Sequence, residues 1–476
     1  MQRVARDAAS HDATSRWKHL CPVPDWVKDS IFYEIFPERF ANGNPDNDPP
    51  DVKPWGGTPT RTNFLGGDLQ GILDKLDYLK ALRIDAIYLT PIFAANTNHK
   101  YDTIDYYQVD PHFGDLNTFR SLLRKAHDRG IRIVLDAVFN HVGDGFWAFR
   151  DVVEHGESSP YVNWFYIEDF PVTRTPTPNY GTYSKAPYLV RLNVYNPEVR
   201  RYLYDVARHW TQEGIDGWRL DVPFLMNHRF WKGFRRVVKE INPELYIVAE
   251  IWKKATSWLQ GDECDGAMNY RLRNLILDFF IHRKLDASTF DRKLAALRAE
   301  HPGETAYTML NLLGSHDTPR LLTLCGGDRE LFKVAVAFLF TYVGVPMIYY
   351  GDEVGMTGGN DPDCRRPMVW DPALQDQELL EWHRQLIRIR KAHPALRRGT
   401  IQTAHALEDI YCFERQYGAD YVLVVLNRDV VSQTIRLRDE SWRGRAAMRD
   451  EISGQVYAAS EPVEVAGRSV QILVPG

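Results

Sequence analysis

Short apolar runs alternate with stretches of helical periodicity over most of the chain. Each run has the length and composition of a buried parallel strand. The runs are Ile31–Phe36, Ala86–Leu89, Ile131–Val138, Gly217–Val222, Tyr246–Glu250, Ala267–Tyr270, Thr308–Leu313 and Val345–Tyr350. Eight strand–helix repeats predict an α/β fold with a closed (β/α)₈ (TIM) barrel rather than an open sheet.

Three of the intervening helices have clear sequence signals. Apolar residues at helical spacing predict a helix between Leu69 and Leu82. A second amphipathic helix spans Leu116–Ala126, with Asp115 as its N-cap. A third covers Leu379–Arg390 and ends before Pro394, because the residue before a proline disfavours the helical conformation.

The periodicity also divides the chain into domains. Residues 1–27 are polar and aperiodic and are predicted to be a poorly ordered arm before a barrel at 28–394. Residues 142–197, rich in Pro, Tyr, Ser and Thr, interrupt the barrel after strand 3 and predict an inserted domain, and a loop of that length is usually functional. Residues 395–476 predict a separate all-β sandwich domain. Its clearest strand candidates are Ile410–Phe413, Tyr421–Leu426, Ser432–Leu437 and Ser469–Val474.

Charge and composition narrow the possible partners. The 476 residues carry a net charge of −5, which argues against a nucleic-acid or anionic-membrane partner, since either requires a basic face. The 5 cysteines are scattered without C-x-x-C spacing and predict buried thiols rather than a disulfide framework or zinc site. No apolar run has the length of a signal peptide or a membrane span, so a cytoplasmic location is expected. Aromatic residues make up 12% of the chain, which fits either a large aromatic core or a sugar-binding cleft.

Polar residues close several of the predicted strands. In a (β/α)₈ barrel the active site lies at the carboxyl ends of the strands. The polar residues there are Asp136, Asn140 and His141 on strand 3, Arg219 and Asp221 on strand 4, Glu250 on strand 5, and Ser315, His316 and Asp317 on strand 7. A charged group after a buried strand is costly unless it is paired or faces a cleft, so one shared cleft is predicted.

Asp221 and Glu250 suit glycoside hydrolysis with retention of configuration. They are about one βα repeat apart, so they lie on adjacent strands about 4.8 Å apart. That spacing is compatible with the roughly 5–5.5 Å that separates the carboxyl groups of retaining enzymes. Arg219 points to the same side of its strand and can keep Asp221 ionised. Glu250 follows an apolar run, and we hypothesise that its pKa is raised so that it acts as the acid.

Each of these residues also has a structural interpretation. An Asp after a strand is commonly a helix cap or half of an ion pair, and Arg219 with Asp221 could be an internal salt bridge. A single buried histidine, such as His141 or His316, is commonly a hydrogen-bonded core residue. The catalytic interpretation rests on acid–base groups occurring together at four strand ends.

Four passages at these positions resemble motifs of the α-amylase family, glycoside hydrolase family 13. They are DAVFNH at Asp136–His141, GWRLDV at Gly217–Val222, VAEIW at Val248–Trp252 and LLGSHD at Leu312–Asp317. The resemblance implies that Asp221 is the nucleophile, Glu250 the acid/base and Asp317 a carboxylate that stabilises the transition state. It further implies that Arg219, His141 and His316 bind the sugar at the cleaved bond, that Tyr101 stacks on it, and that Asp361 and Arg365 hold the next sugar.

Within that family the sequence is most similar to the neopullulanase, cyclomaltodextrinase and maltogenic amylase group. The similar passages are FPERFANGNPDNDPP, RLNVYNPEVRRYL and YGDEVGMTGGNDPDCRRPMVWD. The resemblance implies a structural Ca²⁺ bound by Asn42, Asn44, Asn47, Asp48, the Gly66 carbonyl and Asp68. Such oxygen ligands suit calcium, although a segment rich in Asn and Asp also forms turns without a metal. Asn140 is either structural or a ligand of a second calcium.

Two departures from this group affect the prediction. Its members usually carry an N-terminal β-domain that takes part in dimerisation, whereas about 27 residues precede the barrel here, so both a monomer and a homodimer stay open. The group has Asn-Glu at the positions where this chain has Phe224 and Leu225, so handling of the acceptor sugar should differ.

The sequence therefore predicts hydrolysis of α-1,4 or α-1,6 glucosidic bonds in malto-oligosaccharides, cyclodextrins, pullulan or starch. Transglycosylation would follow if a sugar hydroxyl replaced the water. One alternative is a trehalose synthase-like isomerase or transferase of the same fold. Another is an inert relative, either a carbohydrate-binding scaffold or an ancillary transporter subunit, which the three intact carboxylates argue against.

Overall fold

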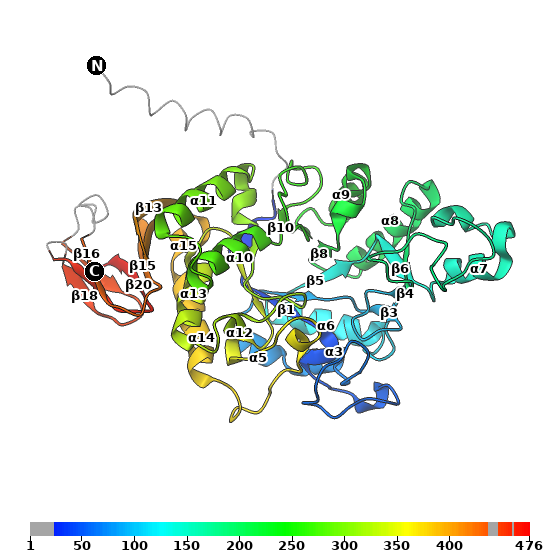
Figure 1. Ribbon diagram of the computed structural model, residues 1–476, viewed down its shortest axis with the longest axis horizontal. Coiled ribbons are helices and arrows are strands. Elements are labelled where there is room, and N and C mark those ends of the chain that lie inside the picture. The colour runs from blue at the N-terminus through cyan, green and yellow to red at the C-terminus, as the bar shows by residue number, and fades with distance from the viewer. Residues whose placement is uncertain (1–22, 437–445, 459–460) are drawn as a thin grey trace, which may run out of the picture.

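The computed structural model describes residues 23–436, 446–458 and 461–476, and its centre is the predicted barrel (Figure 1). The barrel strands are β1 (Phe32–Ile35), β2 (Ala86–Leu89), β5 (Arg132–Ala137), β8 (Gly217–Leu220), β9 (Tyr246–Ala249), β10 (Gly266–Ala267), β11 (Leu310–Asn311) and β12 (Val345–Tyr349). They form one parallel sheet in the order β10-β9-β8-β5-β2-β1-β12-β11. A parallel bridge between Met268 and Leu310 joins the two ends of that order, so the (β/α)₈ prediction is confirmed.

The sixth and seventh strands are much shorter than predicted. In place of Ala267–Tyr270 the structure has β10 at Gly266–Ala267, because Tyr270 is already the first residue of helix α10. Gly266 has no room for a side chain, since a Cβ there would lie 2.2 Å from the Thr308 carbonyl oxygen.

Helices surround the barrel (Figure 1). They include α4 (Leu69–Asp74), α5 (Leu76–Ala81), α6 (Leu116–Asp128), α8 (Pro197–Gln212), α9 (His228–Ile241), α10 (Tyr270–Ile276), α11 (Ala287–Ala299), α12 (Leu321–Leu324), α13 (Arg329–Thr341) and α14 (Gln377–Ala392). The Asp115 cap is confirmed, because its Oδ1 accepts the Thr118 N–H at 2.8 Å. The helical pattern predicted between Leu69 and Leu82 is confirmed, but it forms two helices, α4 and α5, because the chain is interrupted at Lys75, where φ is −100° and ψ is 5°.

A short helix at the start of the described chain closes the amino end of the barrel. Val27, in α2 (Asp25–Lys28), is fully buried against the residues that fill the barrel interior. Trp26 stacks on Phe32, and its Nε1 donates to the Glu244 carbonyl oxygen at 2.8 Å. The predicted arm is therefore wrong for these last residues, which belong to the barrel, whereas residues 1–22 lie outside the described residues.

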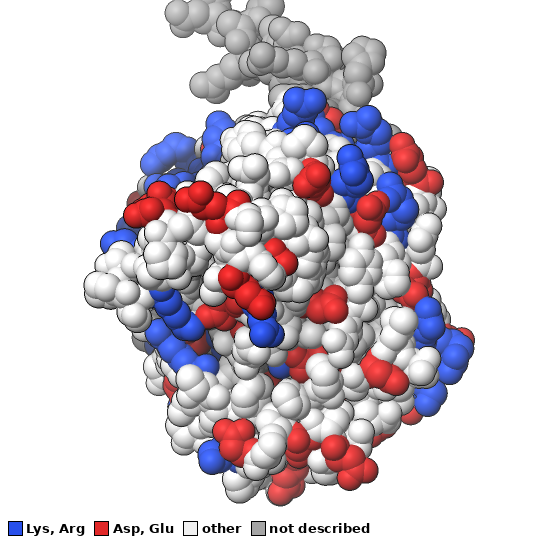
Figure 2. Space-filling view, turned by 90° about the vertical axis from the view of Figure 1, so that its right-hand side faces the viewer, with Lys and Arg blue, Asp and Glu red and all other residues white. Residues whose placement is uncertain are grey.

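The segment after the third barrel strand forms a distinct lobe. Its strands β6 (His141–Gly143) and β7 (Leu189–Arg191) pair antiparallel, and α7 (Trp147–His155) lies at the far end of the molecule (Figure 1). A second hairpin, β3 (Phe93–Ala95) with β4 (Thr103–Val109), adjoins it. Side chains of both charges are interspersed on the face that carries this lobe (Figure 2).

The C-terminal residues form antiparallel sheets at the opposite end of the molecule (Figure 1). A short helix, α15 (Pro394–Arg398), leads into them. The strands are β13 (Thr400–Leu407), β14 (Ile410–Tyr417), β15 (Asp420–Asn427), β16 (Gln433–Ile435), β17 (Ala447–Asp450), β18 (Val456–Ala458), β19 (Val463–Val465) and β20 (Ser469–Pro475). A six-stranded sheet and the β16–β19 pair share a small core, which confirms the all-β prediction.

The cysteines and the helices bear on two further predictions from the sequence. Cys264, Cys325, Cys364 and Cys412 are buried free thiols, and Cys21 lies outside the described residues. Within the described part of the chain, no helix combines the length and the apolar character needed to cross a membrane.

Candidate active site

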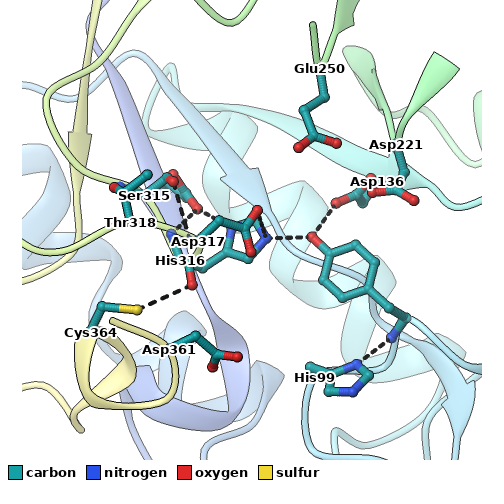
Figure 3. Close-up of polar contacts among 12 residues, drawn as sticks. His99, Asp136, Asp221, Glu250, Ser315, His316, Asp317, Thr318, Asp361 and Cys364 are labelled. Carbon is teal, nitrogen blue, oxygen red and sulfur yellow. Dashed lines mark hydrogen bonds and ion pairs between the residues drawn. The ribbon is translucent and has the colours of Figure 1, made fainter. Parts of the chain in front are cut away.

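A cavity of about 650 Å³ opens at the carboxyl ends of the barrel strands. Its lining includes eight of the predicted site residues: Tyr101, His141, Asp221, Glu250, His316, Asp317, Asp361 and Arg365. Residues of the inserted lobe, Tyr183, Tyr188 and Leu189, line it as well. Figure 3 shows Glu250 and Asp221 on one side of this active-site cavity and Asp317 on the other.

Arg219 lies beneath the cavity and contacts three carboxylates. Its Nη1 is 2.9 Å from Oδ1 of both Asp136 and Asp221, and its Nη2 is 3.0 Å from Oε2 of Glu250. Arg219 is fully buried and is absent from the cavity lining. Arg219 therefore lies in direct contact with the carboxylates of the site, and its implied contact with the sugar stays a prediction.

Asp221 and Glu250 follow the ends of adjacent strands. Leu220 of β8 pairs in register with Ala249 of β9, and the Glu250 N–H donates to the Leu220 carbonyl oxygen at 3.0 Å. Glu250 Oε1 accepts the Trp252 indole N–H at 2.8 Å, and Oε2 accepts the Val222 N–H at 3.2 Å. Because one guanidinium contacts both carboxylates, the two groups can act on the same bond.

Burial raises the pKa of both Asp221 and Glu250, and Arg219 opposes that effect. The charge of Glu250 further raises the pKa of Asp221, and the charge of Asp317 further raises that of Glu250. Simultaneous ionisation of Asp221 and Glu250 is therefore disfavoured by burial and by the negative charges around them.

Asp317 is held ionised on the opposite wall. His316 Nε2 lies 3.2 Å from its Oδ2, and Arg365 Nη2 lies 3.3 Å from its Oδ1. Burial by itself would raise the pKa of Asp317, but the positive charges of His316 and Arg365 bring it below its usual value. Asp317 can thus accept hydrogen bonds from sugar hydroxyls.

The predicted aromatic and histidine residues of the site lie together. The Tyr101 hydroxyl donates to Asp136 Oδ2 at 3.0 Å and lies 2.8 Å from His316 Nε2. The ring of His141 stacks on Tyr183 of the inserted lobe, with centroids 4.6 Å apart. Burial lowers the pKa of His141 to about 3, so this ring is neutral at physiological pH.

Asp361 and Arg365 form the rim on the other side. Arg365 Nη1 lies 3.1 Å from Asp361 Oδ1, and its Nε donates to the His316 carbonyl oxygen at 2.8 Å. The structure therefore brings both residues into the cavity, as the resemblance implies. Which sugar they contact stays a prediction.

Several residues of the site were not predicted from the sequence. Trp252 lies in the same motif as Glu250, and Tyr183 and Tyr188 lie in the Tyr-rich insertion, so the sequence contained a signal for all three. Glu34, which contacts His316, is a single charged residue in an apolar run, which was also a signal. Arg61 and Thr62 line the cavity without any pattern that marks them. 

An exposed apolar pair follows the Asp221 strand. Phe224 and Leu225, in the turn η4 (Pro223–Leu225), are 45% and 40% exposed. The turn begins after Val222, whose φ of 36° lies in the left-handed region. A β-branched residue rarely adopts this conformation, so the backbone directly after Asp221 is strained.

The six residues of the predicted calcium loop lie close together. Asn42 Nδ2 is 2.9 Å from both carboxylate oxygens of Asp48, and Asn47 Nδ2 is 3.3 Å from Asp68 Oδ2. The Asn44 N–H donates to Asp68 Oδ2 at 2.9 Å. A Cβ on Gly66 would lie 2.3 Å from Asp48 Oδ1, so Gly66 closely approaches this group.

The chemistry of the loop fits a calcium ion. The side-chain carbonyl oxygens of Asn42 and Asn47 are buried and have no hydrogen-bond partner. Buried acceptors of this kind require a donor or a cation, and amide and carboxylate oxygens are the ligands calcium prefers. Over the described residues no group of three or more His, Cys, Asp or Glu side chains could hold a metal ion; the predicted loop instead offers three Asn, two Asp and one backbone carbonyl.

Comparison with known proteins places this geometry in a family. The family model described as "Alpha amylase, catalytic domain" matches residues 34–375. Neopullulanase 2 of Thermoactinomyces vulgaris is 50% identical over 421 residues, covering 87% of this chain and 72% of that protein. A cyclomaltodextrinase of Geobacillus thermopakistaniensis is 51% identical over 413 residues, covering 86% and 70%.

A solved structure has the same fold throughout. The ligand-free cyclic α-maltosyl-(1→6)-maltose hydrolase of Arthrobacter globiformis superposes with a TM-score of 0.90 at 48% identity, covering 95% of this chain and 100% of that one. The strand-end carboxylates, the barrel and these relatives agree, and the chain belongs to the α-amylase family of glycosidases.

Proposed function

We propose that the protein is a retaining hydrolase of α-glucosidic bonds, with Asp221 as nucleophile and Glu250 as acid/base. The observation that carries this proposal is the contact of the single Arg219 guanidinium with both carboxylates. This contact holds the two acidic groups in fixed positions on one side of the cavity, as a double-displacement mechanism requires.

In the first step, Glu250 gives its proton to the glycosidic oxygen as the bond to the anomeric carbon breaks. Asp221 attacks that carbon and forms a glycosyl ester. Arg219 holds Oδ1 of Asp221, so Oδ2 is the oxygen left for the attack. In the second step, a water molecule gives a proton to Glu250 while its oxygen displaces Asp221, and both side chains return to their starting states.

The other wall of the cavity binds the sugar through polar groups. Asp317, kept ionised by His316 and Arg365, accepts hydrogen bonds from sugar hydroxyls and stabilises the positive charge of the transition state. Tyr101 provides a ring face for the sugar, and the neutral His141 can accept or donate one hydrogen bond.

The substrates are short α-glucans with α-1,4 bonds, and α-1,6 bonds are the alternative. Cyclodextrins and other small cyclic glucans are favoured over starch. The support is the identity of about one half with proteins named cyclomaltodextrinase and cyclic α-maltosyl-(1→6)-maltose hydrolase, and the lobe residues Tyr183 and Tyr188 beside the cavity. Phe224 and Leu225, exposed in the turn that follows Asp221, are expected to affect transfer to a second sugar.

The test is a comparison of initial rates on β-cyclodextrin, cyclic α-maltosyl-(1→6)-maltose, pullulan, soluble starch, maltotriose and trehalose, with products resolved by chromatography. The expected result is release of maltose, glucose or panose, fastest from a cyclic substrate. Conversion of trehalose or maltose without new reducing ends would instead identify an isomerase. Faster cleavage of starch than of every cyclic glucan would contradict the substrate proposal.

A structural Ca²⁺ is part of the proposal. It would be held by Asn42, Asn44, Asn47, Asp48, the Gly66 carbonyl and Asp68, and it would supply the missing partner of the two buried amide oxygens. Because Asp68 also caps helix α4, the ion would stabilise the junction of this loop with the barrel.

We also propose a cellular location for the protein. A protein named intracellular maltogenic amylase from Bacillus subtilis is 44% identical over 427 residues, which supports a cytoplasmic location. A monomer and a homodimer both stay open predictions.

A further inference from the structure

A buried glutamate lies behind the cavity, on the first barrel strand. Glu34 in β1 is fully buried, and its Oε1 lies 2.6 Å from His316 Nδ1 and 3.2 Å from the His316 backbone nitrogen. Its Oε2 has no hydrogen-bond partner. An isolated carboxylate in such a position is costly, so its partner must offset the burial.

The second nitrogen of His316 also faces oxygen atoms. His316 Nε2 lies 2.8 Å from the Tyr101 hydroxyl and 3.2 Å from Asp317 Oδ2. A neutral imidazole has one N–H, whereas the imidazolium has two and can donate on both sides. The groups that face His316 are Glu34 from β1, Tyr101 and His99 from the loop before β4, Asp317 beside it, and Cys364 and Arg365 from η8 (Asp363–Arg365).

We propose that Glu34 is a positioning residue whose buried carboxylate holds His316 doubly protonated, so that its Nε2–H faces Asp317 and the bound sugar. Glu34 itself contacts neither the cavity nor the substrate, and it acts only through His316. The proposal rests on the proposed function for its effect on rate, but the protonation state of His316 is independent of that function.

The sign of the pH effect follows from the charges. Asp317 and Glu34 raise the pKa of His316 above its ordinary value, against the opposite effects of burial and of Arg365. Removal of the Glu34 charge therefore lowers the pKa of His316. Above that pKa the ring is neutral and a donor toward Asp317 or the sugar is lost, so substrate binding weakens first.

The experiment uses Glu34→Gln, which keeps the shape of the side chain and one hydrogen-bond acceptor. The matched control is Glu353→Gln, since Glu353 is equally buried, also has one unpartnered oxygen, and is bonded by the hydroxyls of Tyr33 and Tyr78 rather than by His316. The ¹⁵N NMR titration of His316, assigned with His316→Gln, is recorded for wild type and both variants. The pH profiles of kcat/KM and kcat on β-cyclodextrin, or on the substrate cleaved fastest, accompany it.

The proposal expects His316 to be protonated on both nitrogens at pH 7 in the wild type. In Glu34→Gln its midpoint falls by about one pH unit or more, the size of effect that an adjacent charge produces. The alkaline loss of kcat/KM moves to lower pH with it, mainly through KM, and Glu353→Gln shifts neither midpoint. A neutral His316 in the wild type at pH 7, or an unchanged midpoint in Glu34→Gln, would overturn the proposal. If the variant fails to fold, a neutral His316 in the wild-type spectrum still overturns the proposal.

Discussion

Arg219 Nη1 lies 2.9 Å from Oδ1 of Asp221, two residues further along the same strand end. Successive side chains of a strand point to opposite faces, so this spacing directs both side chains to the barrel interior. The same guanidinium contacts Glu250 and Asp136, so its position is fixed from three sides. A single buried cation therefore contacts all three carboxylates on this side of the site.

Replacement of Arg219 by Lys should impair catalysis although the charge is kept. A lysine presents one ammonium and cannot bridge three carboxylates with fixed geometry. We expect kcat/KM to fall by about 10²-fold or more, comparable to the loss of one oriented electrostatic contact. Initial-rate kinetics measure it, with Arg235→Lys as control, because Arg235 pairs with the buried Asp265 outside the cavity. Equal effects of the two variants would contradict a specific role for Arg219.

Trp252 should matter through its indole N–H. Trp252→Phe keeps an aromatic ring against Tyr270, whose centroid lies 3.6 Å away, but removes the hydrogen bond to Glu250 Oε1. A hydrogen bond to a charged group contributes about 1.5–3 kcal/mol, so a fall in kcat/KM of about tenfold or more is expected. Trp382→Phe, which loses one bond to a backbone carbonyl on the barrel exterior, is the control. Retention of full activity by Trp252→Phe would show that Glu250 is held without it.

Much of the architecture and site could be predicted because it depends on local pattern. Alternating strands and helices determine the barrel, and the residues that close the strands necessarily meet at one end of it. Asp221 and Glu250 were predictable on that basis, since each directly follows a buried strand.

The rest depends on contacts between distant segments. Burial of Arg219 beneath the cavity follows from the surrounding carboxylates and could not be inferred from strand spacing alone. Trp26 and Val27 lie in a polar stretch of the sequence. They belong to the core only because they pack against the apolar residues inside the barrel. Arg61 reaches the cavity from a long loop that has no periodicity.

The calcium loop should contribute to thermal stability. A ligand at about 100-fold over its Kd stabilises by about 2.7 kcal/mol, which for a chain of this length is a Tm shift of about 2–4 °C. Calorimetry with EDTA and then excess Ca²⁺ should show this loss and its recovery. Asp48→Asn should abolish the response, whereas Asp46→Asn, an exposed residue of the same loop, should keep it. An identical Tm with and without calcium would contradict the proposed structural Ca²⁺.

Phe224 and Leu225 should affect the fate of the glycosyl enzyme. Both side chains are exposed directly after the Asp221 strand and offer no hydrogen bonds to a sugar acceptor. The double variant Phe224→Asn, Leu225→Glu should therefore raise the ratio of transfer to hydrolysis products from maltotriose, by about twofold or more. Exchange of the exposed Leu374 for Glu serves as the control, because Leu374 lines a different hollow and not the active-site cavity. An unchanged product ratio would exclude these residues from acceptor binding.

The identity of the nucleophile is the central claim, and the rate of Asp221→Asn tests it most directly. Asp265→Asn is the matched control, because Asp265 is equally buried and paired with an arginine but precedes β10 rather than following a strand. With β-cyclodextrin, pullulan, starch and maltotriose as substrates, Asp221→Asn should lose at least about 10³-fold in rate while Asp265→Asn remains active. If Asp221→Asn instead matched the wild type on every substrate that the wild type cleaves, Asp221 would be a structural residue and the proposed mechanism would be wrong.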